Sequence, residues 1–109
     1  MYKLTVYIPE SHLETVKSAL FEAGAGRYAQ YDACCWQVCG EGQFRPLPGS
    51  SPFLGEAGAV ERVAEYRVEM LVAPEIAPNV AEALRRSHPY EEPAFDFCRV
   101  ETDFGPGNG

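Results

Sequence analysis

Hydrophobic and polar residues alternate with a period of two in short segments of the chain, and two longer segments have apolar residues at helical spacing. The alternating or aromatic-rich segments, which predict β-strands, are 2–8, 31–38, 64–72 and 94–101. The segments with helical spacing are 11–24 and 75–87. This order of elements predicts an α+β fold of the ferredoxin-like βαββαβ type, with one antiparallel sheet and two helices.

Residues at the ends of both predicted helices favour these boundaries. Ser11 and Glu14 have the spacing of a capping box, and Gly24 suits the left-handed position that follows a helix. His88 precedes Pro89, and the residue before a proline is pushed out of the helical region. The second helix is therefore expected to stop at this pair.

An internal repeat supports the order of elements. Shifting the chain by 64 positions brings apolar residues of the first strand and helix onto apolar residues of the third strand and second helix. The matched pairs include Leu4 with Val68, Val16 with Val80 and Cys34 with Cys98. Two related β-α-β halves would produce this match, although apolar positions also match by chance. The alignment predicts that the following side chains face inward: Cys34, Trp36, Cys98 and Val100.

The segment 40–58, between the second and third predicted strands, is rich in glycine, proline and serine. Connections of this length without secondary structure are uncommon inside a compact domain and often have a function. We therefore expect a long loop that contacts a ligand, a partner protein or another subunit.

Length and charge limit the classes of function. With 109 residues, 46% of them hydrophobic, the chain suits one domain, which we place at residues 1–103, followed by a flexible tail at 104–109. The formal net charge is −7, and only nine residues are lysine or arginine. Nucleic-acid binding depends on clustered positive charge, so no nucleic-acid partner is expected.

The N-terminal sequence lacks the continuous apolar run of a signal peptide, and no segment reaches membrane-spanning length. We therefore expect a soluble, cytoplasmic protein without a membrane partner. The four cysteines are expected to be reduced in that compartment.

A short segment after the second helix contains residue types that bind metals. In the string His88-Pro89-Tyr90-Glu91-Glu92-Pro93, one imidazole and two carboxylates lie on a proline-stiffened stretch. Imidazole suits zinc, copper or nickel, and carboxylates accept most divalent cations. His88, Glu91 and Glu92 are thus candidate metal ligands. The alternative is a structural turn in which Tyr90 packs and the acidic pair is solvated.

The string from His88 to Asp96, the loop stretches 42–46 and 52–55, and the strand 61–69 resemble the YqfO-type proteins of the NGG-interacting-factor family. The resemblance covers residues 1 to about 103. It implies that this module is an insertion in the middle of larger, two-part metal-binding members, and that here it stands alone. The di-metal site of that family lies in the flanking halves, so none of its ligands can be assigned to this chain, whose only histidines are His12 and His88.

The string from His88 to Glu91 also resembles a motif of the CutA proteins, which share the ferredoxin-like fold with the PII signalling proteins and assemble as trimers. This resemblance implies that the candidate metal or ligand site lies near a subunit interface. It also implies that the 40–58 loop lies where PII proteins have their partner-binding loop. Within this loop we expect Phe44, Arg45 and Phe53 to contact a ligand.

These observations favour a non-enzymatic, CutA- or PII-like regulatory module that senses a divalent metal or small ligand and contacts a partner protein. The module is expected to form a homo-oligomer, either a dimer or a trimer. One alternative is a metal-dependent hydrolase related to the larger YqfO-type proteins. Another is a structural subunit that docks onto a separately encoded metal-binding partner.

Overall fold

The structure is a computed structural model that describes residues 1–102; the predicted tail at 104–109 lies outside the described residues. Four strands and two α-helices follow one another as β1 (Tyr2–Pro9), α1 (Leu13–Glu22), β2 (Trp36–Phe44), β3 (Glu61–Val72), α2 (Ala77–Ser87) and β4 (Phe95–Arg99). Short 3-10 turns, η1 (Glu10–His12) and η2 (Pro74–Ile76), lead into the two helices. The predicted order of elements is confirmed.

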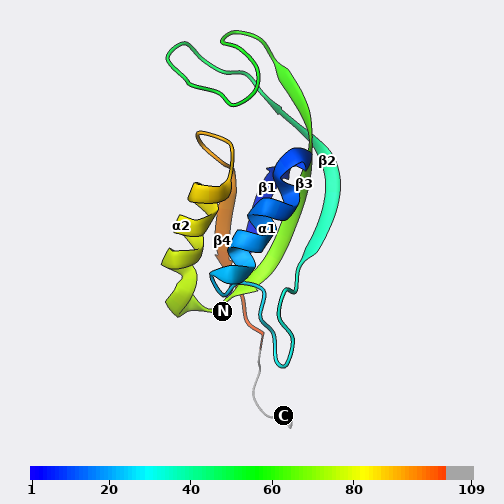
Figure 1. The fold of residues 1–109 in the computed structure, drawn as a ribbon, viewed down its shortest axis with the longest axis vertical. Coiled ribbons are helices and arrows are strands. Elements are labelled where there is room, and N and C mark those ends of the chain that lie inside the picture. The colour runs from blue at the N-terminus through cyan, green and yellow to red at the C-terminus, as the bar shows by residue number, and fades with distance from the viewer. Residues whose placement is uncertain (103–109) are drawn as a thin grey trace.

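The four strands form one sheet in the order β2-β3-β1-β4, and every neighbouring pair is antiparallel. Both helices lie on the same face of the sheet and leave the other face uncovered (Figure 1). The ferredoxin-like α+β fold is thereby confirmed. Within the described residues, no helix is long and apolar enough to cross a membrane.

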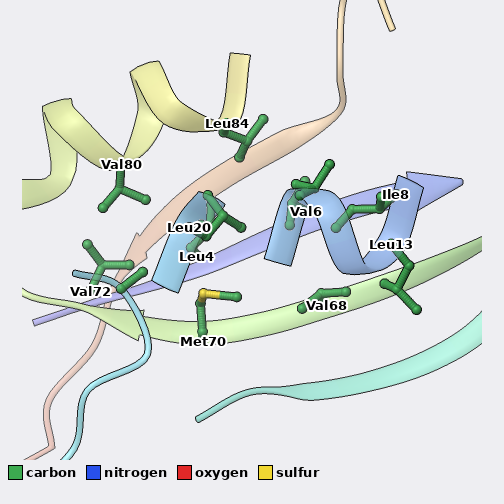
Figure 2. Packing of buried hydrophobic residues seen from close by; sticks show 12 residues of the cluster. Leu4, Val6, Ile8, Leu13, Leu20, Val68, Met70, Val72, Val80 and Leu84 are labelled. Carbon is green, nitrogen blue, oxygen red and sulfur yellow. The ribbon is translucent and has the colours of Figure 1, made fainter. Parts of the chain in front are cut away.

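The hydrophobic core fills the space between the helices and the sheet (Figure 2). Alternate residues of β1 and β3 point into it, because successive side chains of a strand face opposite sides. The repeat pairs Leu4 with Val68 and Val16 with Val80 are all fully buried. Burial of each such side chain contributes about 1.5–3 kcal/mol, so the residues that the repeat relates are also those that hold the two layers together.

The second strand lies later in the chain than the prediction of 31–38, and spans Trp36–Phe44. Ahead of it, Ala29 and Ala33 adopt positive φ angles of 53° and 55°, and Tyr28 and Tyr31 pair with each other in an isolated bridge. The chain therefore turns where a strand was expected. Since β2 reaches residue 44, the connection to β3 covers residues 45–60 rather than 40–58; we call it the 45–60 connection.

The predicted inward faces of the second and fourth strands are wrong. Trp36 is 56% exposed and lies opposite Glu69, and Cys98 is also exposed. In β4, Phe97 lies opposite Leu4 and packs against the core. Directly opposed residues share a face, so the side chain of the neighbouring Cys98 points away from the core.

The start of the first helix differs from the capping-box prediction. Ser11 lies in η1 rather than at the helix end, and its hydroxyl is 2.9 Å from Nδ1 of His12. The first residue of α1 is Leu13, and no side chain caps it. After the helix, Gly24 has φ +106°, which confirms its left-handed position. The second helix stops at His88, which is extended, as predicted.

Candidate functional site

A cavity of about 270 Å³ lies between the 45–60 connection and residues 88–94, which join α2 to β4. We call the latter the 88–94 segment. Both segments lie at the same end of the molecule (Figure 1). They meet directly, because the backbone N–H of Ser51 donates a 3.0 Å hydrogen bond to Oε1 of Glu91.

The cavity brings together residues from the two segments that the sequence analysis selected separately. Phe44 and Phe53, two of the three expected ligand contacts, line it, and so do Glu91 and Glu92. The third, Arg45, is exposed and is not part of the lining. His88 is also absent from the lining.

Aromatic rings form much of the wall. The Tyr90 ring centroid is 6.0 Å from that of Phe44 and 6.3 Å from that of Phe53. These distances are within the range at which aromatic pairs attract each other. His12 packs edge-on against Phe53 at 5.4 Å. The wall is therefore built from β1, the end of β2, the 45–60 connection, β3 and the 88–94 segment, and His12 supports Phe53 without lining the cavity.

Two polar groups in the wall stand out: the Tyr90 hydroxyl, and the Glu65 carboxyl group, which is in none of the ion pairs of the described residues. The hydroxyl of Tyr90 is buried without a hydrogen bond. Burial raises the pKa of the Glu65 carboxyl. Burial, and next the charge of Glu65, raise the pKa of Tyr90; both side chains line the cavity.

Glu65 has room in this position because the facing strand has a glycine there. A Cβ atom on Gly42 would overlap the Glu65 carboxyl group. Gly40, two residues earlier on the same strand, has open space at its Cβ position. Gly42 thus accommodates the carboxyl group, and Gly40 does not contribute to that space.

His88 holds the 88–94 segment against β1. Its side chain is only 6% exposed, and its Nε2 lies 2.7 Å from the carbonyl oxygen of Tyr7. Its Nδ1 lies 3.2 Å from the backbone nitrogen of Tyr90. A carbonyl can only accept and a backbone N–H can only donate, so Nε2 has the hydrogen and the ring is neutral. Burial lowers the pKa of His88, against the raising effect of the bond to Tyr7.

The structure does not bring the predicted metal ligands together. Both ring nitrogens of His88 are engaged with backbone groups, and one oxygen of Glu91 already accepts from Ser51. Within residues 1–102, no group of three His, Cys, Asp or Glu side chains could hold a metal ion. The metal site at His88, Glu91 and Glu92 stays a prediction without a preformed set of ligands.

The cavity is also lined by Tyr7, Glu65 and Tyr90, which the sequence did not indicate as ligand contacts. Tyr90 had been considered only as a packing residue of a turn. Glu65 lies on the charged face of its strand, as does Glu69. Alternation alone therefore does not show which of the two lines a cavity. The distinguishing signal is Gly42 on the neighbouring strand. The register pairs Glu65 with Gly40, and the carboxyl group lies against Gly42, which the sequence alone does not show.

Comparisons with known proteins relate this chain to a segment of longer proteins. A curated relative from Mycobacterium tuberculosis, named GTP cyclohydrolase 1 type 2 homolog, is 47% identical over 108 residues, which are 98% of this chain and 28% of the relative. A crystal structure of a Bacillus cereus protein related to NIF3 matches with a TM-score of 0.79 and 35% identity, over 93% of this chain and 26% of that one. The chain therefore spans less than a third of the length of these relatives.

A second group of structures has similar length. The periplasmic divalent cation tolerance protein CutA from Archaeoglobus fulgidus matches with a TM-score of 0.66 over 95% of this chain and 88% of that one. At 17% identity, this match shows the fold alone. No family model matches the chain.

Proposed function

Because the chain belongs to the YqfO-type proteins of the NGG-interacting-factor family, matching one module of these longer proteins, we propose that it is a non-enzymatic binding module. It takes a small ligand in the cavity and presents the 45–60 connection to a partner protein. Ligand sites are typically concave and mostly apolar, with a few polar groups that fix orientation. The cavity has this character.

The observation that supports this proposal most directly is the composition of the cavity wall. The wall joins the 45–60 connection to the 88–94 segment through the bond from Ser51 to Glu91. A ligand in this space touches both segments at once. Its binding therefore stabilises the arrangement of a connection whose other side is exposed, for example at Leu47.

The hydrolase alternative gains no support from the described residues. The name GTP cyclohydrolase 1 type 2 homolog belongs to relatives of which this chain covers 28%. Metal-assisted hydrolysis needs ligands that hold the ion and leave a position for water. Residues 1–102 contain no group of three such side chains.

Self-association through sheet edges is part of the proposal. The strands β2 and β4 lie at the two ends of the sheet, and unpaired edges favour pairing with another chain. Native mass spectrometry separates a dimer from a trimer and tests this part independently of ligand binding.

The binding function is tested by comparing Phe53→Ala with Leu47→Ala. Both residues are exposed members of the 45–60 connection, but only Phe53 lines the cavity. Protein purified without a metal-affinity step is analysed by native mass spectrometry, and thermal shift is measured against a panel of small molecules. We expect a ligand that binds wild type and Leu47→Ala alike and binds Phe53→Ala at least tenfold more weakly. Equal binding by both variants, or no bound compound, would contradict the proposal.

A further inference from the structure

The cavity has an excess of negative charge. Three carboxyl side chains line it, those of Glu65, Glu91 and Glu92, and among the described residues no lysine, arginine or histidine does. An anionic ligand would meet three like charges there. A cationic ligand would be attracted by all of them.

Glu65 is the acid whose charge is least compensated. Glu65 is half-buried, and this burial raises the pKa of its carboxyl group, which means that the ionised form is less well solvated than it would be in water. The described ion pairs involve other acidic residues, among them Glu69 and Glu82. A bound cation would supply the counter-charge that the fold does not.

The hydroxyl of Tyr90 is the second group that needs a partner. It is buried, has no hydrogen bond within the described residues, and belongs to a side chain that lines the same cavity as Glu65. A buried polar group without a partner is unfavourable. An ammonium or guanidinium group has several N–H donors, so one such group can donate to the carboxylate and to the phenolic oxygen together.

The rest of the wall suits the remainder of such a molecule. The rings of Phe44, Phe53 and Tyr90 surround the space, and aromatic faces attract cations and pack against apolar groups. We propose that the cavity binds a small organic cation, in which a protonated amine, amidinium or guanidinium group is attached to an apolar or aromatic body. This inference rests on the proposed binding function and adds the charge and class of the ligand.

The first test compares probes of different charge and similar shape. Benzylamine, benzamidine, benzyl alcohol and benzoate are titrated at pH 7.5 into wild-type protein, and binding is followed by amide chemical shifts. We expect the two cations to bind at least tenfold more tightly than the alcohol and the carboxylate. Equal or tighter binding of benzoate would overturn the proposal.

The second test changes the acid itself. Glu65→Gln removes the charge inside the cavity, and Glu61→Gln removes one on the same strand at a residue that does not line it. We expect Glu65→Gln to weaken benzamidine binding at least tenfold and to leave benzyl alcohol binding unchanged, while Glu61→Gln changes neither. A Glu65→Gln protein that binds benzamidine like wild type would contradict the role of the carboxylate.

A third test moves the carboxyl group without removing it. Gly42→Ala places a methyl group where the Glu65 carboxyl lies, whereas Gly40→Ala adds the same methyl group in open space. We expect several-fold weaker benzamidine binding in Gly42→Ala alone. Equal affinities in the two variants would refute a role for the contact between the Glu65 carboxyl group and Gly42.

The results separate this inference from the proposed function. A neutral or anionic ligand that is lost in Phe53→Ala would preserve the binding function and refute the cationic ligand. No binding of any probe or compound would refute both.

Discussion

His88 connects the end of α2 to β1, and its replacement tests whether this link is structural. His88→Ala removes the hydrogen bond to the Tyr7 carbonyl at 2.7 Å and the one from the Tyr90 N–H at 3.2 Å. Tyr7 is in β1, and its own N–H bonds to the carbonyl of Ala94. The link therefore fixes both ends of the 88–94 segment to the same strand residue.

The expected loss of stability follows from these two bonds. A buried donor or acceptor that loses its partner costs about 1–3 kcal/mol, so two such groups cost His88→Ala about 2–6 kcal/mol. His88→Gln keeps a side-chain N–H near the position of Nε2 and can still donate to Tyr7. It loses only the acceptor for Tyr90, and we expect a loss of about 1–2 kcal/mol.

Urea unfolding followed by circular dichroism at pH 7.5 and 5.5 measures these differences. Burial holds the pKa of His88 below its usual value, so the unfolded chain takes up a proton more readily than the folded one. The stability contributed by neutral His88 is present above about pH 6.5 and is lost as the pH falls through this value. The difference in free energy of unfolding between wild type and His88→Gln should therefore be smaller at pH 5.5 than at pH 7.5.

Two results would refute this reasoning. One is an unfolding midpoint of His88→Ala equal to that of wild type at pH 7.5, which would mean that the two hydrogen bonds contribute nothing. The other is a stability difference between wild type and His88→Gln that grows on acidification. Native mass spectrometry could instead detect a bound metal in wild type that is lost in His88→Ala. This result would support the predicted metal site.

Other predictions concern the cavity and the helix exit. Burial raises the pKa of Glu65, so its ionisation lowers the stability of the fold as the pH rises from about 4.5. In urea unfolding, Glu65→Gln should therefore have a larger free energy of unfolding than wild type at pH 7.5 and an equal one near pH 3.5. A variant less stable than wild type at pH 7.5 would contradict this. Gly26→Ala should be among the most destabilising changes to a glycine, because φ is +77° and a Cβ would stand 2.8 Å from a backbone oxygen. Gly49→Ala meets only the backbone strain of φ +96°, about 1–3 kcal/mol, and equal midpoints for the two glycine variants would refute the steric argument.

The parts of the fold that sequence patterns predicted correctly are those with one buried face. In β1 and in residues 66–72 of β3, every second residue is apolar because the helices cover that side, so alternation locates both strands. Alternation did not predict the bounds of the second strand correctly, because this strand lies at a sheet edge. Its exposed Trp36 and Val38 leave no face on which a hydrophobic pattern is required.

The candidate site was predicted in pieces for a related reason. Composition singled out the 40–58 loop and the string that begins at His88, since glycine, proline and charged residues mark functional connections. It could not show that the two meet, because contacts between distant segments depend on strand order. It also predicted His88 as a metal ligand, and this stays a prediction; in the structure His88 is buried and both of its ring nitrogens lie near backbone groups.

The contact between Glu91 and Ser51 is expected to hold the two segments that border the cavity together without a ligand. It is the described hydrogen bond that joins the 45–60 connection to the 88–94 segment, and its acceptor is a carboxylate, which makes it stronger than a neutral bond. Glu91→Ala removes this acceptor, so amide hydrogen exchange in residues 50–54 should become faster. Glu92→Ala removes an equal charge from the cavity wall and should leave that exchange unchanged.

Equal exchange in Glu91→Ala and wild type would mean that the aromatic contacts of Phe53 alone hold the connection in place. Faster exchange that slows again when benzamidine is added would show that a cation in the cavity can replace the lost link. Because the same connection is exposed at Leu47, a cation that replaced the lost link would also order the surface that we propose for a partner protein.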